Sequence, residues 1–376
     1  MRTQQQTAAT VLGWLRDGRR VAAGLLASVD GSAPLDVGAS VYIDEHGSVE
    51  GSITGGCVES AVAQEALDII ETGAEPRLIT YGISDELAGT VGLMCGGIVH
   101  VFVHELRGEA RDASIAALEA VIDERPAAVA TLLDGEHAGR KLFVDDDRQV
   151  GSLGGPALLE KNVERESRGL IQHGRTTIRT FGEDGASLGT GLRVHVTAYA
   201  DRPQMIIFGA IDFASALAPL AKGIGYRVTI ADPRKAFLSS ARFSSNSDAV
   251  AAWPDEALEG RTLGPRDAVL VFSHDPKLDV PALLAAFRTQ AGYIGALGSR
   301  KTTADREVRL REAGATDEDI ARVYAPCGLD IGASTVEETA VSVLAEIIAS
   351  RAHRPGIPLR EAEGSIRRDH EDVPVA

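Results

Sequence analysis

The chain has 376 residues, of which 44% are hydrophobic and 24% charged, proportions typical of a folded globular protein with two or three domains. Its formal net charge of −16 disfavours nucleic acid as a partner, because phosphate backbones repel such a chain. There is no apolar run long enough to cross a membrane and no N-terminal signal segment, so we expect a cytoplasmic protein, and the three distant cysteines predict neither a disulfide framework nor a bound metal.

The N-terminal part of the chain predicts short strands separated by Gly and Asp turns. Runs with strand composition occur at 21–29, 39–43 and 98–106. From Cys57 to Thr72, apolar residues recur at a spacing of three to four, which predicts an amphipathic helix packed on a sheet.

An internal repeat with a period of about 100 residues runs through this region. Segments 40–60 and 141–161 both have the order strand, acidic turn, strand, Gly-Ser, Gly-Gly, helix. We therefore predict an N-terminal α+β domain, 1–201, composed of related halves at about 1–110 and 111–201.

The stretch GSITGGCVES places Cys57 directly behind Gly55 and Gly56 at the predicted helix start. Free amides there can bind an anion and lower the pKa of a thiol, and the glycines let a ligand approach the backbone. Glu59 suits the helix dipole or could carry a proton. Because the second copy of the repeat has Pro156 where the first has Cys57, we predict that this cysteine is functional; the alternative is a small buried residue at a tight junction.

A second cysteine, Cys95, precedes Gly96 and Gly97 at the start of a predicted strand. Two groupings of a cysteine with a glycine pair suggest that both thiols face one concave site. There they could pass a sulfur atom, bind a soft metal or form a transient disulfide. The alternative is that the glycines make a turn and Cys95 only fills space. Cys327 is expected to be structural.

From Pro203 onward, short apolar runs alternate with helical patterns. This alternation predicts a parallel, doubly wound sheet, so the fold class expected for the whole chain is α/β. We place this second domain at 202–352. The tail, 353–376, has little periodicity and is expected to be loose or to cross onto another subunit.

The start of the second domain, FGAIDFASALA, resembles a dinucleotide-binding turn, G-x-G-x-x-G/A. Gly209 and Ala214 occupy its outer positions, but Ile211 replaces the middle glycine, which normally lets the backbone approach pyrophosphate. Asp232 ends the next strand, where an acid would hold a ribose. The pattern therefore predicts a nucleotide-binding architecture without tight NAD(P) binding.

Two loops after later strands carry polar residues: SHDPKLD contains His274, and GALGSRKTTADR contains Gly298, Ser299 and Arg300 at a helix start. Ligands of doubly wound sheets bind beyond the carboxyl ends of the strands. The second loop suits a phosphate or another anion. The alternatives are a solvated helix start and an ordinary loop histidine.

Together, the motifs GSITGGCVE, MCGG, ADPRKAF, SHDPKLDVPALL, GYIGALGSR and APCGLDIGASTVEE resemble the XdhC/CoxI family over most of residues 10–350. These are accessory proteins of molybdenum hydroxylases such as xanthine dehydrogenase and carbon monoxide dehydrogenase. The resemblance implies an XdhC/CoxI domain followed by a Rossmann-like domain. It also implies binding of the molybdenum cofactor, protection during its sulfuration and delivery to the apo-enzyme. The family's cysteines fall on Cys57 and Cys95. Its usual first Rossmann turn, G-A-G-H, is replaced here by GAID.

We therefore expect a cofactor-handling chaperone rather than a catalyst. Its expected partners are an apo-hydroxylase, a sulfur-donating desulfurase and a second copy in a homodimer. Two rival hypotheses stay open: an NAD(P)-dependent oxidoreductase or hydroxylase-associated subunit that uses the Rossmann-like domain, and a docking protein with inert cysteines.

Overall fold

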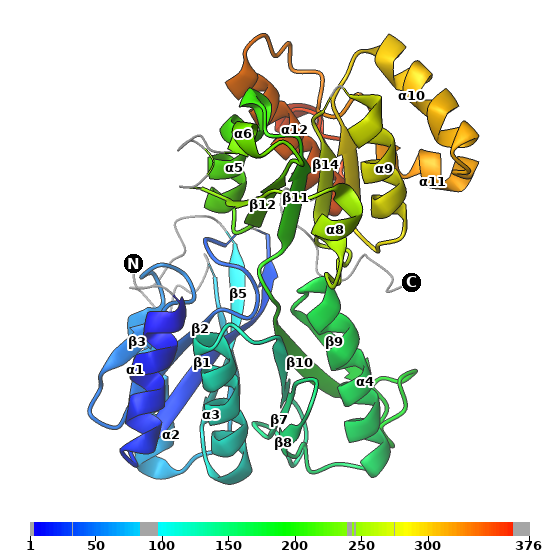
Figure 1. The fold of residues 1–376 in the computed structure, drawn as a ribbon. Coiled ribbons are helices and arrows are strands. Elements are labelled where there is room, and N and C mark those ends of the chain that lie inside the picture. Colours follow the sequence, from blue (N-terminus) through cyan, green and yellow to red (C-terminus); the bar gives the residue numbers. More distant parts are fainter. Residues whose placement is uncertain are drawn as a thin grey trace. The chain divides into compact units, whose positions relative to one another are not determined.

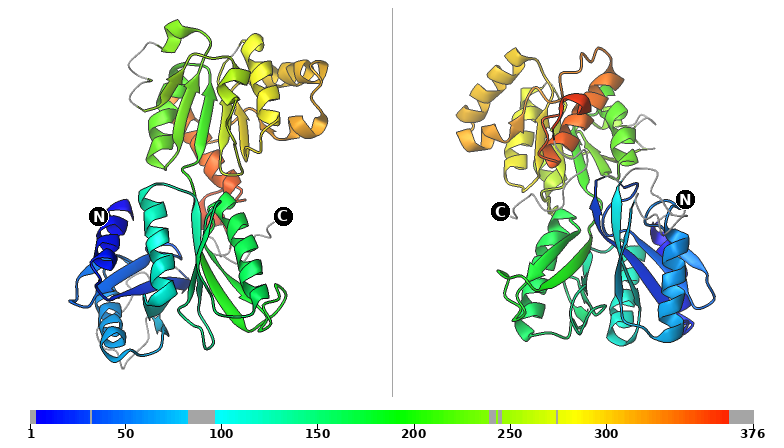
Figure 2. Two further views of the ribbon diagram at one scale, coloured as in Figure 1. Left: turned by 60° about the horizontal axis from the view of Figure 1, so that its bottom comes forward. Right: turned by 180° about the vertical axis from the view of Figure 1, so that it is seen from behind.

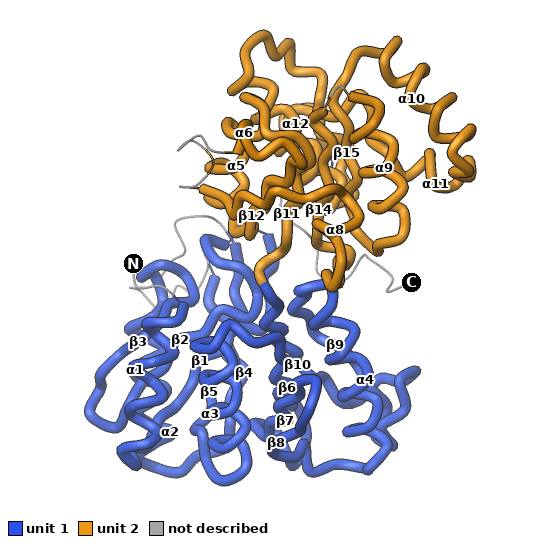
Figure 3. Tube along the Cα trace, viewed as in Figure 1, with its two compact units in different colours: residues 1–201, 363–376 blue, residues 202–362 orange. Residues whose placement is uncertain are grey.

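The computed structural model describes residues 4–31, 33–82, 97–238, 243, 246–273 and 275–363. The chain divides into two compact units, Met1–Asp201 with Glu363–Ala376 (unit 1) and Arg202–Ala362 (unit 2), which Figure 3 distinguishes by colour. Three predicted site residues and part of the expected tail lie outside the described residues: Cys95, Gly96, His274 and 364–376.

Unit 1 contains the same order of elements twice (Figure 1). The first half consists of α1 (Gln4–Arg16), β1 (Val21–Asp30), β2 (Ser40–Asp44), β3 (Val49–Gly51), α2 (Glu59–Thr72), β4 (Arg77–Tyr81) and β5 (Ile98–Glu105). The second half consists of α3 (Gly108–Ile122), β6 (Ala127–Leu132), β7 (Lys141–Val144), β8 (Gln149–Gly151), α4 (Ala157–His173), β9 (Thr177–Phe181) and β10 (Leu192–Tyr199). The antiparallel sheets have matching orders, β3-β2-β1-β5-β4 and β8-β7-β6-β10-β9.

Each sheet of unit 1 is covered on one face by the helix inside its own half. Helix α2 packs on the first sheet through Val62, Ala66 and Ile69, which are fully buried. Helix α4 packs on the second sheet through Leu159 and Val163 in the same way. The spacing of three to four puts these residues on one helix face, and burying that face is what holds each helix on its sheet.

The opposite faces of the two sheets are buried inside unit 1. Helices α1 and α3 pack there, with Leu15 of α1 against Val21 and Leu106. Beyond the helices the sheets meet directly, where Phe102 of β5 contacts Leu133 of the second half. The repeat therefore forms one packed unit.

Unit 2 is a six-stranded parallel sheet with helices on both faces (Figure 2). Its strands are β11 (Gln204–Phe208), β12 (Arg227–Ala231), β13 (Asp248–Val250), β14 (Ala268–Val271), β15 (Tyr293–Ala296) and β16 (Val323–Tyr324). Its helices are α5 (Asp212–Gly223), α6 (Lys235–Leu238), α8 (Pro254–Leu258), α9 (Pro276–Phe287), α10 (Arg300–Glu312), α11 (Asp317–Ala321), α12 (Val336–Arg351) and the 3-10 helix η1 (Leu359–Glu361). The order β13-β12-β11-β14-β15-β16 is that of a Rossmann fold.

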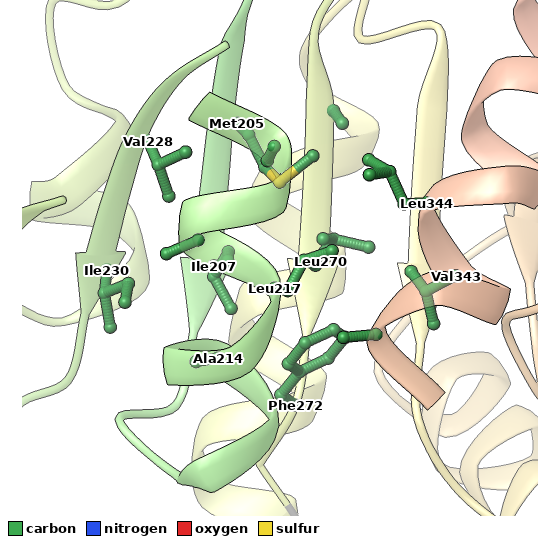
Figure 4. Packing of buried hydrophobic residues seen from close by; sticks show 14 of the residues in the cluster. Met205, Ile207, Ala214, Leu217, Val228, Ile230, Leu270, Phe272, Val343 and Leu344 are labelled. Atoms are coloured by element: carbon green, nitrogen blue, oxygen red, sulfur yellow. The ribbon is translucent and has the colours of Figure 1, made fainter. Parts of the chain in front are cut away.

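Alternate residues of β11 face opposite layers, because side chains alternate along a strand. Met205 and Ile207 pack toward α5 and α12 (Figure 4). Ile206 and Phe208 pack against Leu283 of α9 on the other face. A strand covered on both faces has a continuous apolar sequence, which is the pattern that predicted this sheet. The expected fold class, a two-halved α+β unit followed by a doubly wound parallel sheet, is confirmed.

Candidate functional site

The Gly55–Gly56 turn lies between β3 and α2 on the surface of unit 1. Both glycines have positive φ, 81° at Gly55 and 121° at Gly56. A Cβ atom placed at either position would have no atom within 4 Å, so the turn is open to solvent. These glycines are required for backbone conformation, since nothing would sterically exclude a side chain there.

The carboxylate of Glu59 folds back and binds this turn. Its Oε1 accepts hydrogen bonds from Ser52 Oγ (2.6 Å), Ile53 N (3.0 Å), Thr54 N (2.8 Å) and Gly55 N (3.0 Å). Its Oε2 accepts from Thr54 Oγ1 (2.8 Å), Gly56 N (2.9 Å) and Val58 N (3.2 Å). The amides that were expected to be free for an external anion are therefore already bound to the protein's own carboxylate.

This geometry changes the expected roles of two residues. Burial by itself would raise the pKa of Glu59, but the hydrogen bonds from Ser52 and Thr54 outweigh it and lower that pKa to about 2. A carboxylate that stays ionised at neutral pH supports the turn and is a poor proton carrier. The helix begins at Glu59 and not, as predicted, at Cys57, because the backbone is not helical at Gly56 (φ 121°) or at the N-cap Val58 (φ −120°, ψ −5°).

Cys57 is a free cysteine at the end of this turn. Its side chain is partly buried against the core under α2, and it directly follows the exposed Gly56. It is thus neither fully enclosed nor projecting freely.

The second half of unit 1 has the same support without the cysteine. Glu160 accepts hydrogen bonds from Ser152 Oγ and from Leu153 N, the latter at 3.0 Å. Pro156 caps the following helix. Because Glu160 is the counterpart of Glu59, the position of Cys57 is taken in the second half by Leu158 and not, as predicted, by Pro156. The carboxylate support forms there without a thiol, and a functional role of Cys57 stays a prediction.

Only Gly97 of the second predicted cysteine–glycine grouping lies within the described residues. It is buried directly before the start of β5. Its Cα lies 3.6 Å from where a Cβ of Gly31 would be, at the end of β1. It therefore contributes to close packing of these strand ends.

In unit 2, Gly209 and Asp232 form the first turn of the Rossmann sheet. Gly209 has a φ of 111°, and a Cβ there would lie 2.9 Å from Ser273 N, so only glycine fits between these strand ends. The fully buried Asp232 accepts a hydrogen bond from Ala210 N (2.9 Å) and binds the guanidinium of Arg234 (2.9 and 2.8 Å). Burial alone would raise the pKa of Asp232, but the bonds from Arg234 and Ala210 lower it. The acid expected to hold a ribose is thus already paired within the chain.

The loop with Gly298, Ser299 and Arg300 forms the N-terminus of α10. Ser299 caps the helix by accepting a hydrogen bond from Thr302 N (3.1 Å), and Arg300 is exposed. Behind the loop lies Arg306, whose side chain is 2% exposed. A Cβ at Gly298 would be 3.6 Å from Arg306 Nη2.

Arg306 was not predicted as a site residue. Its Nη2 donates to Leu297 O (2.7 Å) and to Asp279 (3.2 Å), whereas its Nε and Nη1 have no partner among the described residues. The sequence offers only a weak signal, because α10 is charged throughout and Arg306 differs from its neighbours only in sharing the inward face with Leu310. It adds a buried cation next to the loop that was predicted to bind an anion.

Cys327 is buried, with 8% of its surface exposed, and its amide donates to Ala296 O at 3.1 Å. Burial is the main reason that the pKa of its thiol rises to about 12. These features agree with the structural role expected for this residue.

Within the described ranges, no helix combines the length and apolarity needed to cross a membrane. The same residues contain no cluster of three or more His, Cys, Asp or Glu side chains that could hold a metal ion.

Two family models match this chain, one in each unit. The model of the XdhC and CoxI family matches residues 14–82 and 121–182, one segment in each half of unit 1. The model of the XdhC Rossmann domain matches residues 205–347. A crystal structure described as a xanthine dehydrogenase from Bacillus halodurans shares the fold, with a TM-score of 0.64 and 21% identity over 96% of this chain and 98% of that chain.

Three curated relatives are similar in sequence. A protein of Bacillus subtilis named as a probable xanthine dehydrogenase subunit is 28% identical over 90% of this chain and 95% of its own length. The molybdenum cofactor insertion chaperone PaoD of Escherichia coli is 27% identical over 90% of this chain and 86% of its own length. The E. coli protein YqeB is 30% identical over 61% of this chain, which covers 44% of that protein.

The fold defines a class of protein: a repeated α+β unit followed in the chain by a Rossmann unit. Both family models match in the corresponding order. The chain belongs to the XdhC/CoxI family, as the resemblance of its motifs indicated.

Proposed function

We propose that this protein binds the molybdenum cofactor, supports its sulfuration and delivers it to a molybdenum hydroxylase of the xanthine dehydrogenase type. The names of two relatives point in this direction, one a molybdenum cofactor insertion chaperone and the other a probable xanthine dehydrogenase subunit. The proposed partners are the apo-hydroxylase, a desulfurase that supplies sulfur and a second copy of this chain. We propose that it acts in the cytoplasm.

The observation that carries the proposal is the open Gly55–Gly56 turn that ends at Cys57. Glu59 holds the turn in place, the two glycines before Cys57 are exposed, and Cys57 itself is partly buried. A thiolate is a soft ligand, of the kind suited to the metal of this cofactor. Cys57 is therefore the residue that we assign to the metal end of the cofactor, with Cys95 as its proposed companion.

Unit 2 has, by itself, groups suited to a phosphate or another anion. The Gly298–Ser299 loop opens α10, and the two unpaired nitrogens of the buried Arg306 lie behind it. A guanidinium binds phosphate oxygens through paired N–H groups, and helix N-termini favour negative charge. We propose that Arg300 and His274 also take part.

The test is activation of a client hydroxylase. Replacing Cys57 with Ala should leave folding intact, because the second half forms the same turn without a cysteine, but should remove most of the sulfuration-dependent activity of the client. Folding is checked by thermal unfolding, and client activity is measured after reconstitution with released cofactor.

Cys327→Ala is the matched control, since that thiol is buried, and it should lower stability more than client activation. Binding of released cofactor by the wild-type protein no stronger than by an inert acidic protein would reject the proposal. Equal client activation by Cys57→Ala and wild type would remove the assigned role of the thiol.

The rival function, an NAD(P)-dependent oxidoreductase, is supported by the strand order of unit 2. It is opposed by Ile211 at the middle glycine position and by the pairing of Asp232 with Arg234. We expect no low-micromolar binding of NADH or NADPH in a fluorescence titration. Such binding would favour the rival.

A further inference from the structure

A small polar cavity lies inside unit 1, where the two halves and α3 meet. Its volume is about 20 Å³, which is room for roughly one particle of the size of a water molecule. Apolar residues such as Leu25 and Val129 form part of its wall. The polar part is formed by Ser40, Tyr42, His104, Ser114, Thr131, Lys141, Thr197 and Tyr199.

Strand register shows that equivalent positions of the repeat meet in this cavity. Leu25 pairs with Ser40 in the first half, as Thr131 pairs with Lys141 in the second. Ser40 and Lys141 are thus equivalent positions, and both line the cavity.

His104 and Thr197 form a second equivalent pair. His104 lies opposite Ala23, and Thr197 lies opposite Val129. Ala23 and Val129 are equivalent because each pairs with the corresponding residue of the next strand, Tyr42 of β2 and Phe143 of β7. In each pair one half has a small hydroxyl residue and the other has a basic group. Lys141 and His104 are therefore additions that the repeated scaffold does not require.

The added groups are buried and incompletely satisfied. Lys141 is 7% exposed, and its Nζ donates to Thr131 Oγ1 at 2.9 Å. His104 is fully buried; its ring interacts with the backbone of Phe102, but neither ring nitrogen forms a hydrogen bond of normal geometry with a described residue. A neutral imidazole still has one N–H to donate.

The cavity has no negative group to balance Lys141. No Asp or Glu lies on its wall, and in the described part of the chain Lys141 forms no ion pair. A buried ammonium without a counter-charge is costly, by several kcal/mol in general. A particle that accepts hydrogen bonds and carries one negative charge would satisfy Lys141, Thr131 and His104 together.

We propose that this cavity is a binding site for one small monovalent inorganic anion of the size of chloride, held by Lys141, Thr131 and His104. The ion would link the two halves of unit 1 through β5, β6 and β7. The inference is independent of the proposed cofactor role, because it concerns neither Cys57 nor unit 2.

Anion binding should depend on pH through Lys141. Burial lowers the pKa of Lys141 to about 7, so the side chain is partly neutral near neutral pH and gains charge below it. Burial, and then repulsion by Lys141, lowers the pKa of His104 well below its usual value, so this ring stays neutral. Burial also raises the pKa of Tyr42 and of Tyr199, the other titratable groups on the wall, so both keep their protons. Anion affinity is therefore expected to increase as pH falls through about 7.

The test uses the full chain in chloride-free gluconate buffer at constant ionic strength. Adding chloride or bromide should raise the unfolding midpoint by about 3 °C for each ten-fold increase above the dissociation constant, and by more at pH 6 than at pH 8.5. Lys141→Met should abolish this rise. Lys161→Met, at an exposed position of α4, should retain it.

Crystals of the wild-type protein soaked in bromide keep the test independent of how the variants fold. An anomalous peak within hydrogen-bonding distance of Lys141 Nζ, together with the halide effect in solution, would support the proposal. An ordered water without anomalous signal would overturn it. So would a halide effect that Lys141→Met retains, or bromide in crystals with no effect in solution.

Discussion

The Glu59 carboxylate and the Lys141 ammonium are charged groups that unit 1 withdraws from water in different ways. Glu59 is surrounded by amides and hydroxyls that stabilise its charge, and the pKa falls to about 2. Lys141 has one hydroxyl partner, and burial lowers its pKa to about 7. Hydrogen bonds therefore decide the protonation state that the fold favours at Glu59, whereas burial decides it at Lys141.

The support given by Glu59 predicts a pH-dependent stability. Because its folded-state pKa is about 2, below the ordinary value of 4.5, the stabilisation is complete above pH 4.5 and is lost as pH falls toward 2. Glu59→Gln should lower the free energy of unfolding by about 2 kcal/mol at pH 7, allowing for partial solvent screening. The difference from wild type should shrink below pH 4.5 in denaturant titrations.

Glu160→Gln provides the matched control for this prediction. Glu160 supports the equivalent turn through Ser152 and Leu153, so its replacement should cost less. A constant difference between wild type and Glu59→Gln from pH 7 to pH 3 would contradict the assigned pKa.

At the scale of elements, the first strand–turn–helix of unit 2 depends on close approach of strand ends. Gly209 lies against the backbone of Phe272 and Ser273 at the end of β14. Its amide donates to Ala231 O at 3.0 Å, and the next amide is held by Asp232. The turn thus joins β11 to β12 through its backbone amides and lies against the end of β14.

Gly209→Ala should therefore destabilise unit 2 by about 3 kcal/mol, from a positive φ and a Cβ placed 2.9 Å from Ser273 N. Gly223→Ala is the control, because Gly223 is helical and a Cβ there meets nothing within 4 Å; it should be neutral or stabilise by up to about 1 kcal/mol. Chemical denaturation measures both. Equal effects of the two changes would show that Gly209 is not sterically required.

At the scale of the whole molecule, each unit has its own hydrophobic cores. The cores of unit 1 draw only on residues of that unit, and those of unit 2 surround β11, β12, β14 and β15. We propose that the two units are independent folding domains.

This predicts that fragments 1–201 and 202–362 fold separately. Each should show a cooperative thermal transition and a circular dichroism spectrum that, weighted by length, sums to that of the full chain. A fragment without a cooperative transition would show that its stability depends on the other unit.

The class of fold could be predicted because it depends on local periodicity. Apolar spacing along α2 and the continuous apolar strand β11 both follow from short-range geometry, and the repeat showed that unit 1 has two related halves. The family could be inferred from separated motifs such as GSITGGCVE. The importance of Cys57 was inferred from its absence in the second copy and stays a prediction.

The roles of several charged residues could not be predicted in this way. Asp232 was expected to hold a ribose, but its pairing with Arg234 and Ala210 depends on how the turn closes. Arg306 becomes buried only because α10 packs beside α9, which provides Asp279. No spacing pattern in the sequence predicts contacts between residues that are so far apart along the chain.

The amino-acid sequence by itself determined the elements, the repeat, the family and the position of a thiol behind two glycines, because periodicity and turn chemistry act over a few residues. Only the tertiary structure decided that Glu59 binds the turn amides and that Lys141 and His104 line one cavity. Those arrangements depend on side-chain direction and on the packing of strands from different halves, where burial and hydrogen-bond partners set the charge of each group.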